Sequence, residues 1–256
     1  MSRAIWITGA SSGIGRELAL QLARRGDSVA VSARRADELR KLAAEAGPGR
    51  VLPYPVDVGD AAAMARAADE IEAALGPLSL AVFNAGTHAP VEIERFSAAP
   101  FRHLMEINYM GAVNGLAAVV PRFVARRAGH VAVVSSVAGY RGLPSASAYG
   151  PTKAALINLC ESLKPDLDRY GVRISLINPG FVRTPLTDLN PFPMPFLMEA
   201  DAAARRIVAG LDKGAFEITF PRRFTFMLKL ARILPYALYF RLVKRATRRD
   251  GQAVGG

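Results

Sequence analysis

The chain has 256 residues, of which 51% are apolar, so its length and composition exclude a disordered protein and suffice for one α/β domain. Its single cysteine, Cys160, excludes an intrachain disulfide, and no run of about twenty apolar residues predicts a membrane-spanning helix. The formal net charge is +11, but residues 221–249 hold nine basic and no acidic side chains, so the rest of the chain is nearly neutral.

Short apolar runs alternate with helical patterns along the chain. Strands are predicted at 4–8, 28–33, 51–55, 78–83, 130–135, 172–178 and 216–220. Helices are predicted at 13–25, 36–46, 60–75, 99–127, 147–169 and 200–213. This alternation predicts a doubly wound (Rossmann-type), mostly parallel seven-stranded sheet with helices on both faces, formed by residues 1–220 and extended by 221–256. Pro165 is expected to kink or break its helix.

The first predicted strand leads into the turn Thr8-Gly9-Ala10-Ser11-Ser12-Gly13-Ile14-Gly15, and a helix pattern follows directly. A strand, a tight glycine turn and a helix N-terminus together indicate dinucleotide binding, although glycine marks other tight turns as well. In this pattern the glycines permit the turn, the close approach of a pyrophosphate and close helix packing. We therefore assign cofactor contacts to Gly9, Ser11, Ser12, Gly13, Ile14 and Gly15.

The spacing Thr-Gly-x-x-x-Gly-x-Gly is followed by further short motifs. In chain order they are Asp57-Val58, Asn84-Ala85-Gly86, Asn108, Ser136, Tyr149 with Lys153, and Pro179-Gly180. With these motifs the chain resembles, from residue 4 to about 220, the short-chain dehydrogenase/reductase family in its compact single-domain form. The resemblance implies an oxidoreductase with a nicotinamide cofactor. It also implies a homodimer or homotetramer formed through the helices at 99–127 and 147–169.

The end of the second strand, Ser32-Ala33-Arg34-Arg35, bears on which cofactor is used. An acidic side chain here would bind the adenosine ribose and select NAD, but Ala33 has no carboxylate. Arg34 can bind a 2′-phosphate through charge-assisted hydrogen bonds, with Arg35 as a secondary contact. We therefore predict NADP(H). The alternative is that both arginines only face water at the start of a helix.

Three later segments complete the cofactor site that the resemblance implies. Asp57 would lie near the adenine edge and Val58 against its ring, although Asp57 could also cap the helix at 60–75. The other lining residues follow the fourth strand (Asn84, Ala85 and Gly86) and the sixth strand (Pro179, Gly180, Val182 and Thr184). The residues after the sixth strand would hold the nicotinamide carboxamide.

Tyr149 and Lys153 lie four residues apart, so on a helix they share one face. An ammonium beside a phenol favours the phenolate and is expected to lower a pKa that is ordinarily about 10, which suits Tyr149 to proton exchange. By resemblance, Lys153 also binds the nicotinamide ribose, Ser136 donates a hydrogen bond to the substrate oxygen, and Asn108 holds a water that relays protons. The alternatives are a backbone cap for Ser136 and a buried polar bridge for Asn108.

The segment 185–198 has four prolines, and its large apolar side chains are Phe192, Met194, Phe196 and Met198. Because the resemblance places this segment over the substrate, it favours an apolar, lipid-, steroid- or retinoid-like ligand. A rigid surface loop packed on its own domain is the alternative. His88, His103 and His130 show no metal-site spacing, so we predict no metal and treat all three as structural or surface residues.

Two amphipathic helices are predicted at 224–234 and 236–249, on either side of Pro235. Their basic positions Arg241, Lys244, Arg245 and Arg248 share one face, and Tyr239, Leu242 and Val243 point away from it. Such helices suit an anionic membrane surface, which we expect residues 222–249 to contact. The alternatives are packing on the protein's own body or on a second subunit, and a nucleic acid is not expected.

The sequence therefore predicts an NADPH-dependent oxidoreductase that transfers a hydride between nicotinamide and an apolar carbonyl or alcohol, with Tyr149 as acid and base. A non-catalytic NADP(H)-binding membrane or interaction protein on the same fold is the alternative. The set of Asn108, Ser136, Tyr149 and Lys153 argues against that alternative. Because the first residues enter a strand without the apolar run of a signal peptide, we expect a cytoplasmic protein, peripheral on the inner face of a membrane.

Overall fold

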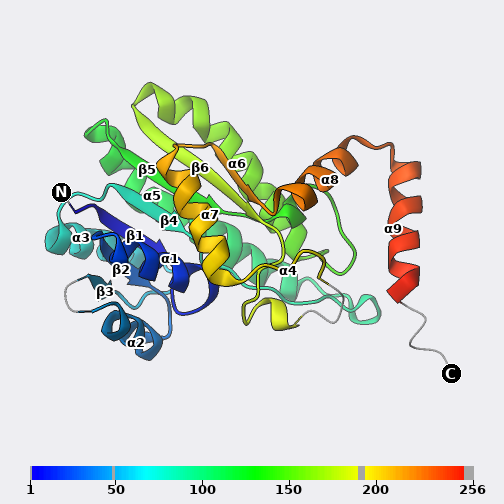
Figure 1. Ribbon diagram of the computed structural model, residues 1–256, viewed down its shortest axis with the longest axis horizontal. Helices are drawn as coiled ribbons and strands as arrows, with labels where there is room; N and C mark the ends of the chain where they lie inside the picture. The colour runs from blue at the N-terminus through cyan, green and yellow to red at the C-terminus, as the bar shows by residue number, and fades with distance from the viewer. Residues whose placement is uncertain (1, 48–49, 190–193, 251–256) are drawn as a thin grey trace.

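The computed structural model describes residues 2–47, 50–189 and 194–250, with side chains described no further than residue 245 (Figure 1). At its centre is a seven-stranded sheet in the order β3-β2-β1-β4-β5-β6-β7. All neighbouring strands are parallel, which confirms the predicted doubly wound sheet. The strands are β1 (Ala4–Thr8), β2 (Ser28–Ser32), β3 (Val51–Pro53), β4 (Leu80–Phe83), β5 (Gly129–Val134), β6 (Val172–Pro179) and β7 (Glu217–Phe220).

Helices cover both faces of the sheet (Figure 1). One face carries α1 (Gly13–Arg24), α2 (Ala36–Ala46) and α7 (Ala200–Asp212), and the other carries α3 (Ala61–Leu75), α5 (Gly111–Ala125) and α6 (Tyr149–Arg169). Two apolar clusters fill these layers because successive strand side chains point to opposite faces. Trp6 and Phe83 belong to one cluster, and Ile5, Ile7 and Val82 belong to the other.

The strand order places the site. Because all strands are parallel, the turns that follow β1, β4, β5 and β6 lie at the same carboxyl edge. From β1 the chain crosses to β2, whereas from β4 it crosses to β5 on the other side, so a crevice opens between the two turns. This edge is where a doubly wound sheet binds its ligand.

The prediction of one helix over 99–127 is wrong. The segment is α4 (Ala99–Met105), a π-helical turn η2 (Glu106–Met110) and then α5. Asn108 lies buried in this turn, a kind of helical irregularity that is frequent at functional sites. Pro165 does not break its helix, because α6 continues through it to Arg169, and the expectation of a kink there stays a prediction.

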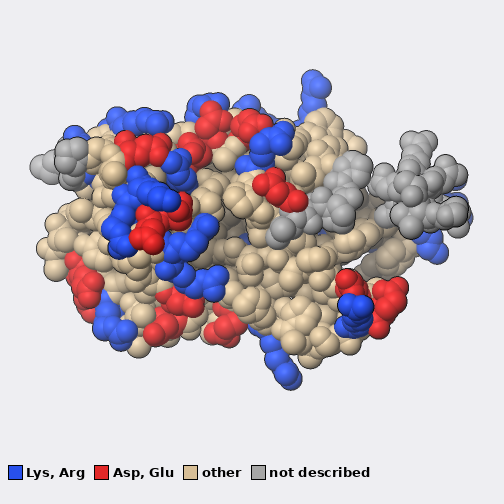
Figure 2. Space-filling view, turned by 90° about the horizontal axis from the view of Figure 1, so that it is seen from below, with Lys and Arg blue, Asp and Glu red and all other residues tan. Residues whose placement is uncertain are grey.

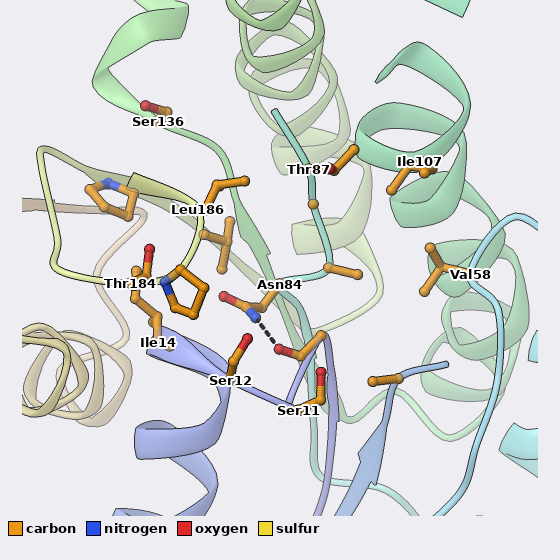
Figure 3. A pocket seen from close by; sticks show the side chains of 18 of the residues that line it. Ser11, Ser12, Ile14, Val58, Asn84, Thr87, Ile107, Ser136, Thr184 and Leu186 are labelled. Carbon is orange, nitrogen blue, oxygen red and sulfur yellow. Dashed lines mark hydrogen bonds between the residues drawn. The ribbon is translucent and has the colours of Figure 1, made fainter. Parts of the chain in front are cut away.

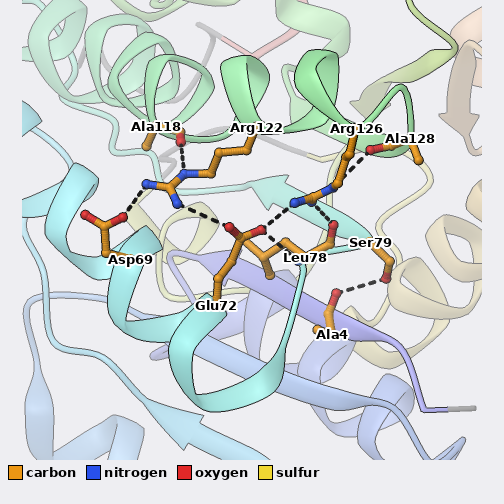
Figure 4. A network of polar contacts seen from close by, with 9 residues as sticks. All are labelled: Ala4, Asp69, Glu72, Leu78, Ser79, Ala118, Arg122, Arg126 and Ala128. Atoms are coloured by element: carbon orange, nitrogen blue, oxygen red, sulfur yellow. Dashed lines mark hydrogen bonds and ion pairs between the residues drawn. The ribbon is translucent and has the colours of Figure 1, made fainter.

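A half-buried carboxylate joins α3 to α5 on the outer layer (Figure 4). Glu72 accepts from Arg122 at 3.2 Å, from Arg126 at 2.8 Å and from the Leu78 N–H at 2.9 Å. Arg122 also donates to Asp69 at 2.6 Å. Burial acts to raise the pKa of Glu72, but these hydrogen bonds outweigh it and hold the pKa below its ordinary value. The charged form of Glu72 is therefore part of the folded structure.

Replacing Glu72 by Gln is expected to lower the free energy of unfolding by about 1 to 3 kcal/mol, since two guanidinium groups lose their shared carboxylate. Urea unfolding at neutral pH measures the change, with Glu70→Gln, exposed on the same helix, as the matched control. The stabilisation should be lost as pH falls from the ordinary glutamate pKa through the lowered pKa of Glu72, because over this window the unfolded chain binds a proton that the native state does not. Equal stability of the two variants would contradict this role.

Both predicted helices of the extension are present, as α8 (Arg222–Ile233) and α9 (Tyr236–Asp250). Arg248, which the sequence places on the basic face, and Arg249 lie outside the residues whose side chains are described. Among the helices described, none combines the length and the apolar character that a membrane crossing needs. In Figure 1, α8 follows β7 along the body and α9 stands at its end.

Candidate active site

A pocket opens at the carboxyl edge of the sheet and brings most of the predicted site residues together (Figure 3). The predicted residues that line it are Gly9, Ser11, Ser12, Gly13, Ile14, Arg34, Arg35, Asp57, Val58, Asn84, Ala85, Gly86, Ser136, Tyr149, Lys153, Pro179, Gly180, Val182 and Thr184. Gly15 and Asn108 are not among the lining residues and support them from behind. Residues that lie up to 175 positions apart in the sequence therefore form one site.

The turn after β1 requires its glycines. Gly9 and Gly13 have φ of +68° and +58°, a region that side chains with a Cβ rarely adopt. A Cβ on Gly9 would lie 2.6 Å from Ala85 Cα, and one on Gly15 would lie 2.5 Å from Asn84 Nδ2. Ser12, at the N-cap of α1, makes no side-chain capping hydrogen bond, so the first N–H groups of the helix are not capped by it. This arrangement fits the pyrophosphate of a dinucleotide.

The ends of β1 and β4 are clamped together by two polar side chains. Asn84 Nδ2 donates to the carbonyls of Thr8 and Gly9, both at 3.1 Å. Thr8 Oγ1 in turn accepts from the N–H groups of Asn84 and Ala85, at 3.1 and 3.2 Å. Asn84 thus holds the shape of the glycine turn in addition to lining the pocket. The clamp role of Thr8 was missed from the sequence, where this residue counted only as the start of the motif.

Two arginines follow the uncharged end of β2, and both line the pocket. Arg35 Nη2 donates to Ser11 Oγ at 2.9 Å and to Ser12 Oγ at 3.2 Å, so its guanidinium lies over the glycine turn. The sequence assigned the main contact to Arg34 and a secondary one to Arg35. In the structure, Arg35 is the arginine that bonds to the turn.

Asp57 lines the pocket and does not cap the following helix. Its Oδ1 accepts from the Gly59 N–H at 3.0 Å, whereas the cap of α3 is Asp60, which accepts from the Ala63 N–H at 2.9 Å. The alternative role of Asp57 as a helix cap is therefore wrong. The two residues between these aspartates are enough for a tight turn in which each carboxylate has a local backbone partner.

Tyr149 begins α6, and Lys153 is buried one turn later. Lys153 Nζ donates to the Val134 carbonyl at 3.0 Å and lies 5.5 Å from the centroid of the Tyr149 ring. Ser136 Oγ accepts from the Ala138 N–H at 3.1 Å and is also hydrogen-bonded to the Tyr149 phenol. Ser136 therefore does cap the backbone, as the alternative held, and the same hydroxyl also reaches the phenol.

Burial governs the protonation of this pair. It raises the pKa of Tyr149 to about 12, against the opposing effect of the hydrogen bond with Ser136. It also lowers the pKa of Lys153 to about 8. The expectation that Lys153 leaves Tyr149 with a lowered pKa is therefore wrong for the protein alone. Burial removes the hydration that stabilises the phenolate, and the attraction of the ammonium over the ring does not make up for this loss. The phenol is protonated at neutral pH.

Asn108 is 1% exposed and uses its whole amide. Oδ1 accepts from the Thr87 N–H at 2.7 Å, and Nδ2 donates to the Thr87 carbonyl at 3.0 Å and to Thr152 Oγ1 at 3.1 Å. A Cβ on Gly86 would lie 3.3 Å from Asn108 Oδ1 and 3.5 Å from Lys153 Nζ. Asn108 thus bridges the loop after β4 to α6, as the alternative for this residue held. Its part in a proton relay stays a prediction.

His88 was assigned to structure or surface from the sequence, but it contacts the phenol. Its ring meets the Tyr149 ring edge-on, with the centroids 5.2 Å apart. Burial lowers the pKa of His88, and its Nδ1 is buried with no hydrogen-bond partner among the described residues. The position of His88, two residues after Gly86 in the loop that follows β4, is the signal that could have identified it.

The loop after β6 forms the remaining wall. Its Pro185, Leu186 and Thr187 line the pocket, and residues 190–193, with the predicted Phe192, lie outside the described residues. The far end of the loop returns to the body through a parallel bridge of Val182 with Met198. The loop is therefore both packed on its own domain and part of the pocket.

Comparisons with known proteins agree with this geometry. The family model for short chain dehydrogenases matches residues 3–191. An oxidoreductase of Myxococcus xanthus is 41% identical over 245 residues, which cover 95% of this chain and 97% of that protein. A short-chain dehydrogenase from Streptomyces avermitilis superposes with a TM-score of 0.81 at 26% identity, covering 98% and 99% of the two chains.

A second solved structure shows the same fold. It is a short-chain dehydrogenase/reductase from Burkholderia phymatum in complex with NAD, with a TM-score of 0.82 at 24% identity over 90% of this chain and 93% of that one. The family match covers most of the sheet and the pocket described above. The chain is therefore an oxidoreductase with an NAD(P)-binding fold, and it belongs to the short-chain dehydrogenase family.

Proposed function

We propose that this protein is an NADPH-dependent reductase of apolar carbonyl compounds, which also runs in the alcohol-oxidising direction. The observation that carries the proposal is that Ser136, Tyr149 and Lys153 line the same pocket as the glycine turn. A proton donor and an oxyanion donor thus lie where a nicotinamide bound by that turn would present its hydride. The apolar residues of the loop after β6 support an apolar substrate.

The reduction needs a proton at the substrate oxygen as the hydride arrives. The bound nicotinamide would supply the hydride. Tyr149, whose pKa of about 12 keeps the phenol protonated, donates its proton to the developing alkoxide. Ser136 hydrogen-bonds the same oxygen and stabilises its charge. Lys153, buried with its ammonium over the phenol ring, stabilises the phenolate that remains.

Several residues would hold the cofactor. The turn at Gly9–Gly15 takes the pyrophosphate, Asp57 and Val58 take the adenine, and Pro179, Gly180, Val182 and Thr184 take the carboxamide. Arg34 and Arg35 take the 2′-phosphate, because both line the pocket at the end of β2, where Ala33 leaves no carboxylate to repel it. Arg35 already bonds the two serines of the turn, which holds its charge near the phosphate. This arrangement favours NADPH over NADH.

Single variants Arg34→Ala and Arg35→Ala are expected to lower kcat/KM for NADPH by about 10- to 100-fold, since each removes a charge-assisted contact. The value for NADH should change little. Cofactor oxidation with a panel of apolar ketones measures both, and Arg40→Ala, exposed on α2, is the matched control. If the wild type used NADH better, or if both cofactors lost activity equally in both variants, the NADPH preference would be refuted.

A further inference from the structure

The outer face of α8 is apolar and exposed. Phe226, Leu230 and Ile233 recur at i, i+4 and i+7 and are 63%, 48% and 79% exposed. On the opposite face, Thr225 is buried and Leu228 packs against the core. An apolar row of this kind, on a helix whose other face is already satisfied by the body, indicates contact with a partner.

The helices α8 and α9 also carry exposed basic side chains. Arg222 and Arg223 lie at the start of α8, and Arg241 and Arg245 share an exposed face of α9. Residues 221–249 contain no acidic side chain, whereas on the body Lys and Arg lie among Asp and Glu (Figure 2). Lys229 is an exception within the extension, because it is paired with Glu217 of β7. The other charges make the exposed side of α8 and α9 strongly positive.

The two helices are held in place by the loop that follows Ser136. Arg141 donates to the Arg232 and Leu234 carbonyls at 3.1 and 2.9 Å, and so ties the end of α8 to the body. Its guanidinium also lies 3.9 Å from the centroid of the Tyr239 ring, and Tyr239 Oη donates to the Gly142 carbonyl. These contacts fix the inner sides of both helices and leave the apolar and basic sides facing outward.

The same helices adjoin the pocket loop. Phe224, on the inner side of α8, lies 5.7 Å from Phe181 and 5.8 Å from Phe196, measured between ring centroids. Phe181 follows β6, and Phe196 belongs to the loop whose other end lines the pocket. The helix α8 would therefore lie between a surface bound to its outer side and the loop that forms a wall of the pocket.

We propose that α8 and α9 dock this protein on the surface of an anionic lipid bilayer. Phe226, Leu230 and Ile233 enter the boundary between head groups and acyl chains, while the arginines contact anionic head groups. Charge complementarity favours this partner over a second copy of the chain. A two-fold contact through this face would bring like charges together with no acidic residue between 221 and 249 to neutralise them. The docking does not depend on the proposed reaction.

Vesicle flotation of the full-length protein tests the proposal. One sample uses equal parts of phosphatidylglycerol and phosphatidylcholine, and the other uses phosphatidylcholine alone. The protein should float with the anionic vesicles and bind neutral ones at least about tenfold more weakly, and high salt should release it. Point variants are used because removal of α8 would also uncover Phe181 and Phe196.

Three double variants locate the surface. Arg241→Glu/Arg245→Glu and Phe226→Ser/Ile233→Ser should each weaken binding to anionic vesicles by about tenfold or more. Arg24→Glu/Arg66→Glu, which makes the same charge change at exposed sites on α1 and α3, should bind like the wild type. Equal binding of all variants, or no flotation of the wild type, would overturn the proposal. So would a smaller assembly of the Phe226→Ser/Ile233→Ser variant in analytical ultracentrifugation, which would assign the surface to a second subunit.

Discussion

Tyr149→Phe is expected to lower kcat for carbonyl reduction by about a thousandfold while leaving NADPH binding unchanged. The variant keeps the ring that contacts His88 and lies beneath Lys153, and it removes only the proton that the developing alkoxide needs. Because the pKa of Tyr149 is raised to about 12, the wild-type phenol carries this proton throughout the neutral range. Steady-state NADPH oxidation gives kcat, and fluorescence titration of NADPH gives the binding constant.

A matched variant separates chemistry from helix structure. Tyr170→Phe removes an exposed hydroxyl at the end of the same helix and should leave kcat unchanged. If Tyr149→Phe kept wild-type turnover, Tyr149 would have no part in proton transfer. That result, together with intact NADPH binding, would favour the alternative of a non-catalytic cofactor-binding protein.

Lys153→Met is expected to lower kcat/KM for reduction by about a hundredfold or more, since the phenolate left on Tyr149 loses its stabilising cation. The pH profile carries the sharper test. Burial lowers the pKa of Lys153 to about 8, so wild-type kcat/KM for reduction should decline above about pH 8 as the ammonium loses its proton. In Lys153→Met this decline should be absent, and its persistence would assign the transition to another group.

The same substitution should stabilise the fold at neutral pH. Below pH 8 the native state must hold a buried ammonium. This destabilises it relative to the unfolded chain, in which the same ammonium is hydrated. Between about pH 8 and the ordinary lysine pKa of about 10.4, the unfolded chain binds more protons, so wild-type stability should rise with pH over this window. Lys153→Met should be more stable at neutral pH by about 1 to 3 kcal/mol and lack that rise. Lys164→Met, at a half-exposed lysine farther along α6 that is paired with Asp168, is the control for both measurements.

The sheet and most of the pocket could be predicted from the sequence for a physical reason. Strands covered on both sides carry apolar residues at successive positions, as residues 4–7 of β1 do, and the glycine turn after β1 needs backbone conformations that only glycine adopts readily. Such requirements act on single residues or short runs, so they leave a readable pattern. The motifs that follow β4, β5 and β6 are readable in the same way, because parallel strands deliver them to one edge.

Other features depend on packing that a short pattern does not record. A π-turn at Asn108 differs from an α-helix by a shift in hydrogen bonding, and the sequence shows only an unfavourable residue in a helical run. Which of two adjacent arginines bonds Ser11 and Ser12 depends on the direction in which the backbone leaves β2. The contact of His88 with Tyr149 joins a loop to a helix 61 positions away, and the pKa of Tyr149 depends on total burial.

The π-turn makes the length of the chain between α4 and α5 a structural variable. A π-turn holds one more residue than the α-helical turn it replaces, so deletion of a single residue from Glu106–Met110 would restore continuous α geometry. Because the wider turn already accommodates the extra residue, α4 and α5 would keep about the same rotation around the helix axis, and Leu104 would stay buried. The change would fall on the turn itself, where Asn108 would lose the position from which it bonds Thr87 and Thr152. Deletion of one residue here would therefore alter the support behind the pocket rather than shorten a loop.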